Sequence, residues 1–216
     1  MQLRPQTRFL MRGSSLLVGL LSLWWFLLLP PMTSALKAAS SVFLTIQEAA
    51  TGDWTLRVPM EGTIPASPEQ PVPQRIHSVD FDLARGDVIA FTFSLPVFWA
   101  VMLAAPGLRR SLRPLVLGTA VMAVLELAML LVFSQIAAQN AATQLIGGGA
   151  AGKWLRHVGE YMVVSVLPYA LPFVVALGVH GALREAVFEW TQGALATAAP
   201  TPAPAGPPRT SKKKRS

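Results

Sequence analysis

The sequence contains no cysteine and few charged residues, and both shortages restrict what the protein can be. Without cysteine, disulfides, thiol nucleophiles and cysteine-ligated metal sites are excluded. Charged residues make up 13% of the 216 residues, whereas an ordinary soluble domain carries about a quarter. Hydrophobic residues account for 52% of the chain, and the mean hydropathy is +0.47. This composition predicts an integral membrane protein.

Four long apolar blocks predict four transmembrane helices. The blocks cover about residues 14–31, 87–105, 115–138 and 161–183. Each is close to the roughly 20 residues with which a helix crosses a hydrocarbon core of about 30 Å. The remaining segments are a basic N-terminus at 1–13, an extracytoplasmic segment at 32–86, a basic cytoplasmic turn at 106–114, an extracytoplasmic loop at 139–160, and at 184–216 a helix end with a disordered basic tail.

The segment at 32–86 has the pattern of a small β structure. Apolar residues occupy every second position in two runs, at Trp54, Leu56, Val58 and Met60 and again at Val79, Phe81 and Leu83. A period of two is typical of strands with one buried face. Before these runs, helical spacing extends from Thr33 or Ser34 to about Ala50. This stretch is either an amphipathic helix on the outer membrane surface or a kinked extension of the first span. The predicted fold class is therefore mainly α, with four transmembrane helices and a two-stranded extracytoplasmic β segment between the first and second.

Basic residues set the predicted orientation. Of the 18 lysine and arginine residues, 12 fall on the side of the two termini and 6 on the other side. The positive-inside rule then places both termini in the cytoplasm. Because the basic residues flank apolar blocks, topology explains the net charge of +7, and we predict no nucleic-acid partner. The cluster at 212–215 is predicted to contact anionic membrane lipid.

Glu126 is the candidate for an intramembrane polar contact, because it lies near the middle of the third block. A carboxylate at the bilayer centre costs about 2.5–3.5 kcal/mol on insertion scales, so it should face other helices and have a partner. The side chain is either a structural contact, within the bundle or to a partner helix, or a proton or substrate site. No basic residue lies at a matching depth in another block.

A second candidate is a polar contact surface on the extracytoplasmic side. Its predicted members come from the end of the β segment and from the entry to the fourth block: Asp80, Asp82, Arg85, Asp87, Arg156, His157 and Glu160. The acidic residues do not have the spacing of a calcium loop. The glycines at 147–149 are not followed by the Lys-Ser/Thr of a phosphate loop. We predict no catalytic residue, no cofactor and no metal.

Several short segments, spread over about residues 8–190, resemble one known family. They are Arg8-Phe9-Leu10 before a Trp-rich first span, Trp54–Val58, Val79–Leu83, Ser94–Ala100, the turn at Ala105–Arg110 and a proline-interrupted fourth span. These segments are similar to those of the exosortase H-associated membrane proteins of Gram-negative bacteria. The resemblance implies an accessory partner of an exosortase, a membrane transpeptidase that processes C-terminal sorting signals and directs cargo towards the envelope surface. The chain itself is not that transpeptidase, because the reaction uses a cysteine.

The leading functional hypothesis is a non-enzymatic inner-membrane accessory component of such a protein-sorting system, scaffolding an integral-membrane partner or its substrate. Two strands alone are marginally stable in water, and Glu126 has no visible counter-charge, so both features favour surfaces completed by another molecule. One alternative is a small transporter or channel subunit that uses Glu126. Another is a membrane-lipid-modifying enzyme that uses Asp80, Asp82 or His157.

Overall fold

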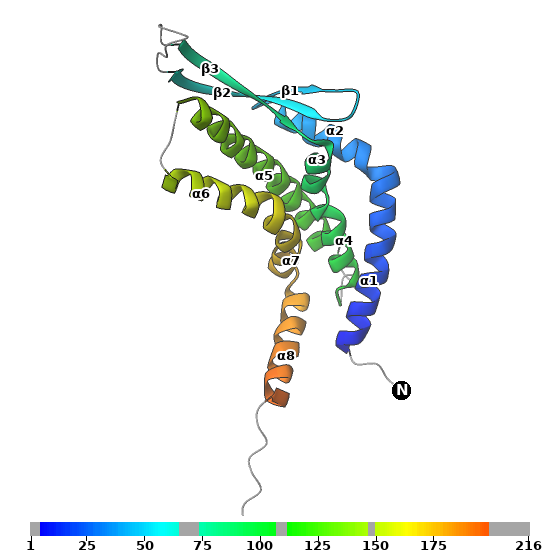
Figure 1. Cartoon of the computed structure of the whole chain (residues 1–216). Coiled ribbons are helices and arrows are strands. Elements are labelled where there is room, and N and C mark those ends of the chain that lie inside the picture. The colour runs from blue at the N-terminus through cyan, green and yellow to red at the C-terminus, as the bar shows by residue number, and fades with distance from the viewer. Residues whose placement is uncertain (1–4, 65–73, 107–111, 147–149, 199–216) are drawn as a thin grey trace, which may run out of the picture.

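The computed structural model describes residues 5–64, 74–106, 112–146 and 150–198 (Figure 1). Four helical stretches within them are long and apolar enough to cross a membrane: Gln6–Ser40, Arg85–Ala104, Arg113–Thr143 and Ala151–Val179. The prediction of a mainly helical chain with four helices of membrane length is confirmed. The basic residues at 107–111 and the predicted basic tail after residue 198 lie outside the described residues.

The first and fourth membrane-length stretches each contain a π turn directly before prolines. In the first, α1 (Pro5–Leu23) continues through the π turn η1 (Trp24–Leu28) into α2 (Leu29–Ser40). In the fourth, α6 (Ala150–Tyr161) continues through η3 (Met162–Val166) into α7 (Leu167–Val179). Prolines stand at the start of both following helices. Because proline has no N–H for the preceding turn, the wider turn absorbs the mismatch, and such sites bend helices. The chain bends between α1 and α2 and again between α6 and α7 (Figure 1).

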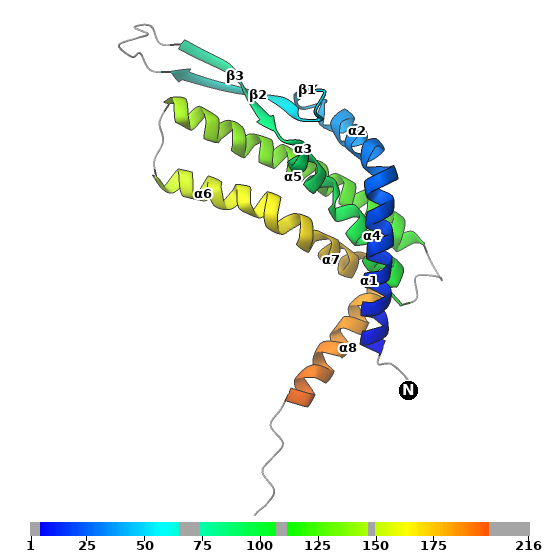
Figure 2. The ribbon, with the colours of Figure 1, turned by 45° about the vertical axis from the view of Figure 1, so that its right-hand side comes forward.

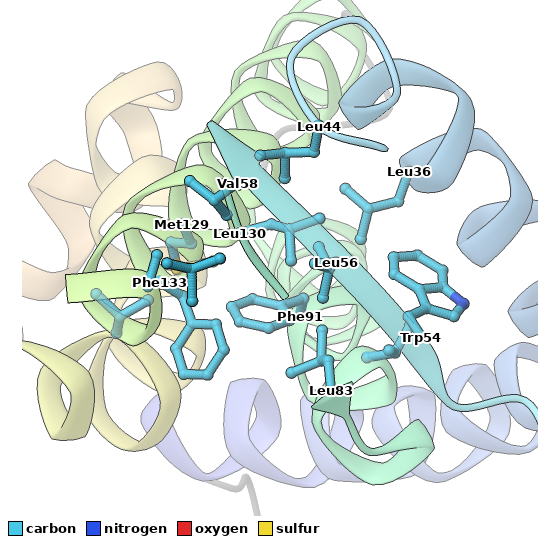
Figure 3. Packing of buried hydrophobic residues seen from close by; sticks show 14 of the residues in the cluster. Leu36, Leu44, Trp54, Leu56, Val58, Leu83, Phe91, Met129, Leu130 and Phe133 are labelled. Atoms are coloured by element: carbon cyan, nitrogen blue, oxygen red, sulfur yellow. The ribbon is translucent and has the colours of Figure 1, made fainter. Parts of the chain in front are cut away.

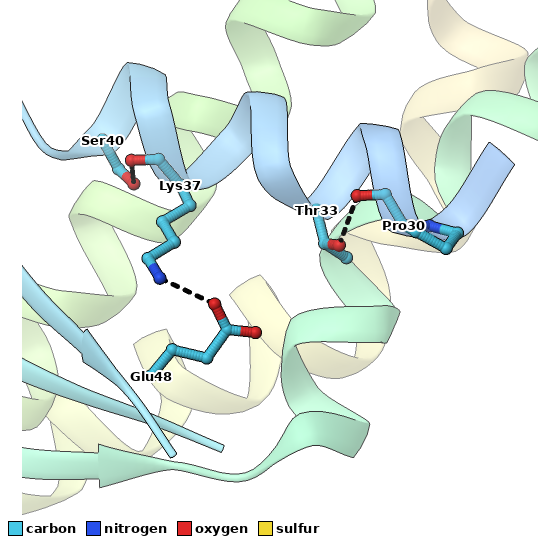
Figure 4. A network of polar contacts seen from close by, with 5 residues as sticks. All are labelled: Pro30, Thr33, Lys37, Ser40 and Glu48. Atoms are coloured by element: carbon cyan, nitrogen blue, oxygen red, sulfur yellow. Dashed lines mark hydrogen bonds and ion pairs between the residues drawn. The ribbon is translucent and has the colours of Figure 1, made fainter. Parts of the chain in front are cut away.

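The helix predicted to run to about Ala50 is a kinked extension of the first span, and it ends at Ser40. The amides of Phe43 and Leu44 both donate to the carbonyl of Ser40, at 2.9 Å. These bonds turn the chain, and Thr45–Glu48 then forms strand β1. The prediction of a helix beyond Ser40 is wrong because pairing with a distant strand overrides the local helical spacing. Lys37 Nζ lies 2.6 Å from Glu48 Oε2 and joins α2 to β1 (Figure 4).

The β segment has three strands, and the prediction of two is corrected accordingly. β1 pairs with β2 (Trp54–Ile64), which pairs with β3 (Gln74–Leu83), in an antiparallel sheet of order β1-β2-β3. The period-two pattern correctly separates the faces, since Leu56 lies opposite Phe81 and Arg57 lies opposite Asp80. β1 escaped detection because four residues are too short to show alternation clearly.

The second membrane-length stretch is broken into α3 (Arg85–Thr92) and α4 (Ser94–Ala104). The break lies at Phe93, three residues before Pro96. Pro96 has no N–H to donate to the carbonyl of Thr92, so the hydrogen-bond ladder is interrupted there. The carbonyl of Thr92 thereby loses its donor, and α4 begins as a new helix inside the bundle at Ser94.

The predicted extracytoplasmic loop at 139–160 is helical where the structure describes it. α5 runs from Arg113 to Ile146, and α6 begins at Ala150. At 1.5 Å per residue, the 34 residues of α5 extend about 51 Å, well beyond a hydrocarbon core of about 30 Å. The loop prediction failed because the polar residues of this stretch bond between the two helices. Figures 1 and 2 both show the sheet, α5 and α6 following one another in layers.

The last helix, α8 (Gly181–Ala198), begins after a break at His180. The backbone of His180 is extended, and its Nδ1 accepts a hydrogen bond from the amide of Leu183 at 3.1 Å. This bond caps the start of α8. The ring of Trp190 on α8 lies 5.4 Å from the ring of Phe9 on α1. The start of α1 and the helix α8 therefore meet, at the end of the molecule away from the sheet (Figure 1).

The sheet is attached to the helices by a hydrophobic core. Its inner face contributes Trp54, Leu56, Val58 and Leu83, and α5 contributes Met129, Leu130 and Phe133 (Figure 3). Phe91 of α3 lies between these two groups. The second half of α5 thus serves as the platform on which the sheet packs.

Candidate functional site

Glu126 lies in a polar contact between α5 and the start of α4. Its side chain is only 5% exposed, and Ser94 Oγ donates a hydrogen bond to Glu126 Oε1 at 2.6 Å. The backbone amide of Leu95 also donates to this carboxyl group. The break at Phe93 makes this possible, because the amides at the start of α4 have no intrahelical acceptors. Glu126 therefore has its polar partners within the chain, and the argument that it awaits a partner from another molecule loses its basis.

Two substitutions distinguish a structural role of the Glu126 side chain from an ionic one. Glu126→Gln keeps a carbonyl oxygen that accepts from Ser94, so thermal stability in detergent should stay close to that of the wild type. Glu126→Leu removes the acceptor and leaves two buried donors, at a cost of about 1–3 kcal/mol. Unfolding temperatures of the wild type and the two variants, measured by light scattering, test this expected ranking of stability. Equal stability of the leucine variant and the wild type would contradict it.

The sheet end of the molecule contains a pocket of about 560 Å³ between β3, α5 and α6. Five of the seven residues predicted for the polar contact surface line it: Asp82, Asp87, Arg156, His157 and Glu160. Lys153 adds a second cation. Phe81 and Phe133 give the pocket an apolar portion. We call this site the outer pocket.

A hydrogen-bond chain across two helices builds the wall of the outer pocket. Arg156 Nε donates to Asn140 Oδ1 at 2.9 Å, and Asn140 Nδ2 donates to Glu160 Oε2 at 3.3 Å. His157 Nδ1 lies 3.7 Å from the same carboxylate oxygen. Arg156 Nη2 is buried and has no hydrogen-bond partner among the described residues. The sequence analysis did not single out Asn140, whose role depends on the contact between α5 and α6.

The other two predicted members lie apart from the outer pocket. Asp80 is on the solvent-exposed face of the sheet, where Arg57 donates two hydrogen bonds to it at 2.7 Å. These bonds, more than the nearby charge, lower the pKa of Asp80 below its usual value. Arg85 begins α3, and its backbone amide donates to Asp53 Oδ1 at 2.9 Å. Its side chain covers Gly52, whose φ of +85° favours glycine.

A smaller pocket of about 360 Å³ continues the outer pocket towards the fourth span. It shares Asp87, Phe133, His157 and Glu160 with the outer pocket, and it adds Tyr161 and residues of η3. Together the two pockets extend from the edge of the sheet to the level at which the fourth span begins. Their walls carry charges of both signs beside apolar surface, which suits recognition of a mixed polar and apolar segment.

Four membrane-length helices with a sheet and a polar pocket at one end define a multi-pass membrane protein with an elaborated end outside the bundle. The family model of the exosortase H-associated membrane proteins matches residues 3–147, and the chain belongs to that family. No curated protein and no solved structure matches the chain. The family match covers the first three spans and the sheet. It ends before α6, and so before residue 190, to which the resemblance was expected to extend.

Proposed function

We propose that this membrane protein is a non-enzymatic accessory component of an exosortase-type protein-sorting system in the bacterial inner membrane. In this proposal both termini lie in the cytoplasm, and the sheet end lies outside. The outer pocket binds a segment of an integral-membrane partner, or a segment of the substrate of that partner. The observation that carries the proposal is the outer pocket itself, in a chain whose family is described by its association with an exosortase.

The edge of the sheet supports a contact with another polypeptide. β3 is an outer strand, and its residues Phe81–Leu83 line the outer pocket. An outer strand presents backbone N–H and C=O groups that have no strand partner on that side. An extended segment of a partner chain would find these groups next to the charges of Arg156 and Glu160. This combination favours a protein-binding role over a reaction centre.

Site-specific photocrosslinking tests the proposal in native membranes. A benzoylphenylalanine placed at His157, an exposed residue of the outer pocket, should form an adduct that contains the exosortase. The matched control is the same probe at Gln47, which is exposed on β1 at the opposite edge of the sheet. An adduct at 157 and not at 47 is the expected result. The proposal fails if position 157 gives no exosortase adduct, or if both positions give it equally.

The break in the second span favours one other candidate function. Transporters use broken helices whose new N-termini face anionic groups of the substrate, and here the new N-terminus of α4 faces the carboxyl group of Glu126. A transporter role requires that Glu126→Gln abolish proton-dependent flux in reconstituted vesicles, whereas an accessory role leaves complex formation intact. Of the three residues of the lipid-enzyme alternative, Asp82 and His157 line the outer pocket, whereas Asp80 bonds to Arg57 on the outer face of the sheet.

A further inference from the structure

Helix α6 is amphipathic, but its polar side faces inward. Lys153, Arg156 and Glu160 line the outer pocket, and Asn140 of α5 bonds to two of them. The apolar side faces away, with Trp154 and Leu155 exposed by 69% and 67%. In a helix that packs on a protein core, the apolar stripe faces the neighbouring helix. The exposed side of α6 must therefore be covered by something other than this chain's described residues.

We propose that the exposed apolar face of α6 lies on the outer surface of the same bilayer that the four spans cross. The face is defined by Trp154, Leu155 and Val158. It continues without a gap through exposed Tyr161 and Met162 into the fourth span. Further along that span, Tyr169, Phe173 and Val174 are also exposed. This continuity with a surface that faces lipid is the argument for lipid as the occupant.

The bend at η3 determines how this face meets the membrane. The π turn and Pro168 separate α6 from α7, and α6 runs obliquely on the side of α5 that is remote from the sheet (Figures 1 and 2). An oblique helix with an apolar outward face suits the boundary between headgroups and acyl chains, where amphipathic helices lie about 5–10 Å deep. Trp154 and Tyr161 are of the residue types that settle at headgroup level.

This placement sets the height of the outer pocket above the lipid. A helix with its side chains is about 10–12 Å across, and the pocket lies on the opposite side of α6 from the exposed face. The pocket would then open about one helix diameter above the acyl boundary. A polypeptide that leaves the membrane beside the fourth span meets the pocket at once. The inference stands independently of the exosortase proposal, because it concerns only lipid contact.

The absence of cysteine makes a direct test possible, since single cysteines can be introduced without removing any. Val158→Cys is labelled with a nitroxide, and its accessibility to oxygen and to a water-soluble nickel complex is measured in nanodiscs assembled from scaffold protein, phospholipid and this protein alone. Gln47→Cys on β1 serves as the aqueous control, and Phe173→Cys on α7 serves as the membrane control. We expect the ratio of oxygen to nickel accessibility at 158 to lie between those of the two controls.

Two results would overturn the inference. The first is a nickel accessibility at position 158 equal to that at 47 in the lipid-only nanodiscs. The second is protection that appears only in native membranes, which would assign the face to a protein instead of lipid. Leu155→Cys repeats the measurement on the same face with less risk than replacing Trp154, and an unchanged unfolding temperature shows that each labelled variant is folded.

Discussion

Replacing Gly118 by alanine is expected to force α4 away from the first turns of α5. A Cβ atom at Gly118 would overlap Cζ of Phe98 and lie 2.8 Å from its Cε2. Phe98 is fully buried beside Met102 and Met122, so its rigid ring has little room to move. Overpacking of a core costs about 1–3 kcal/mol, and occasionally more. The variant should unfold at a lower temperature in detergent, as measured by loss of a monodisperse peak after heating.

Gly178→Ala provides the matched control for this experiment. Gly178 lies in α7, and a Cβ atom there would have no neighbour within 4 Å. Alanine is the better helix former by close to 1 kcal/mol, so this variant should unfold at or slightly above the wild-type temperature. If both alanine variants unfold together, Phe98 does not pack on Gly118 in the way described. In that case α4 and α5 do not meet through these two residues.

Removal of the Phe133 ring is expected to reduce stability by as much as Gly118→Ala does, or by more. This loss of stability should be located at the sheet end of the molecule. Phe133 is 8% exposed, and its ring centroid lies 5.7 Å from that of Phe91 and 6.4 Å from that of Phe81. These three rings join α5, α3 and β3. Truncation of a buried phenylalanine to alanine costs about 3–5 kcal/mol. We expect Phe133→Ala to loosen the sheet from α5, which limited proteolysis within β2 and β3 would detect as faster cleavage.

The same substitution also bears on the proposed function. Phe133 lines both the outer pocket and its smaller continuation, so Phe133→Ala should weaken the crosslink from position 157. Phe173→Ala is the control, because Phe173 is 51% exposed on α7 and lies far along the chain from the sheet. It should change neither cleavage of the sheet nor the crosslink. Cleavage at the wild-type rate in Phe133→Ala would show that the three rings do not hold the sheet.

The effects expected for Gly118→Ala and Phe133→Ala concern different parts of the structure. The Gly118 contact holds α4 against the start of α5, whereas the Phe133 contacts hold the sheet on the second half of α5. The outer pocket lies next to the second of these contacts. A variant that loses the sheet while keeping the bundle would therefore separate anchoring in the membrane from recognition outside it.

Local patterns were sufficient to predict the membrane class, the four spans and the two long strands. Each of these depends on residues that are close in sequence: an apolar run long enough for a bilayer, or alternation such as that of Trp54 and Leu56. Glu126 could be singled out for the same reason, because a lone acid within an apolar run is conspicuous. Its partner could not, since Ser94 is 32 residues away in the sequence and meets Glu126 only when α4 packs on α5.

The tertiary structure alone decided the third strand, the helical form of residues 139–160 and the outer pocket. β1 is too short for its pattern to outweigh helical spacing, and only pairing with β2 reveals it. The polar residues of α6 read as a loop because polar stretches usually face water, whereas here they bond to Asn140 across a helix pair. The physical reason is the same in each case: these features depend on contacts between segments distant in the chain, and one-dimensional spacing carries no record of them.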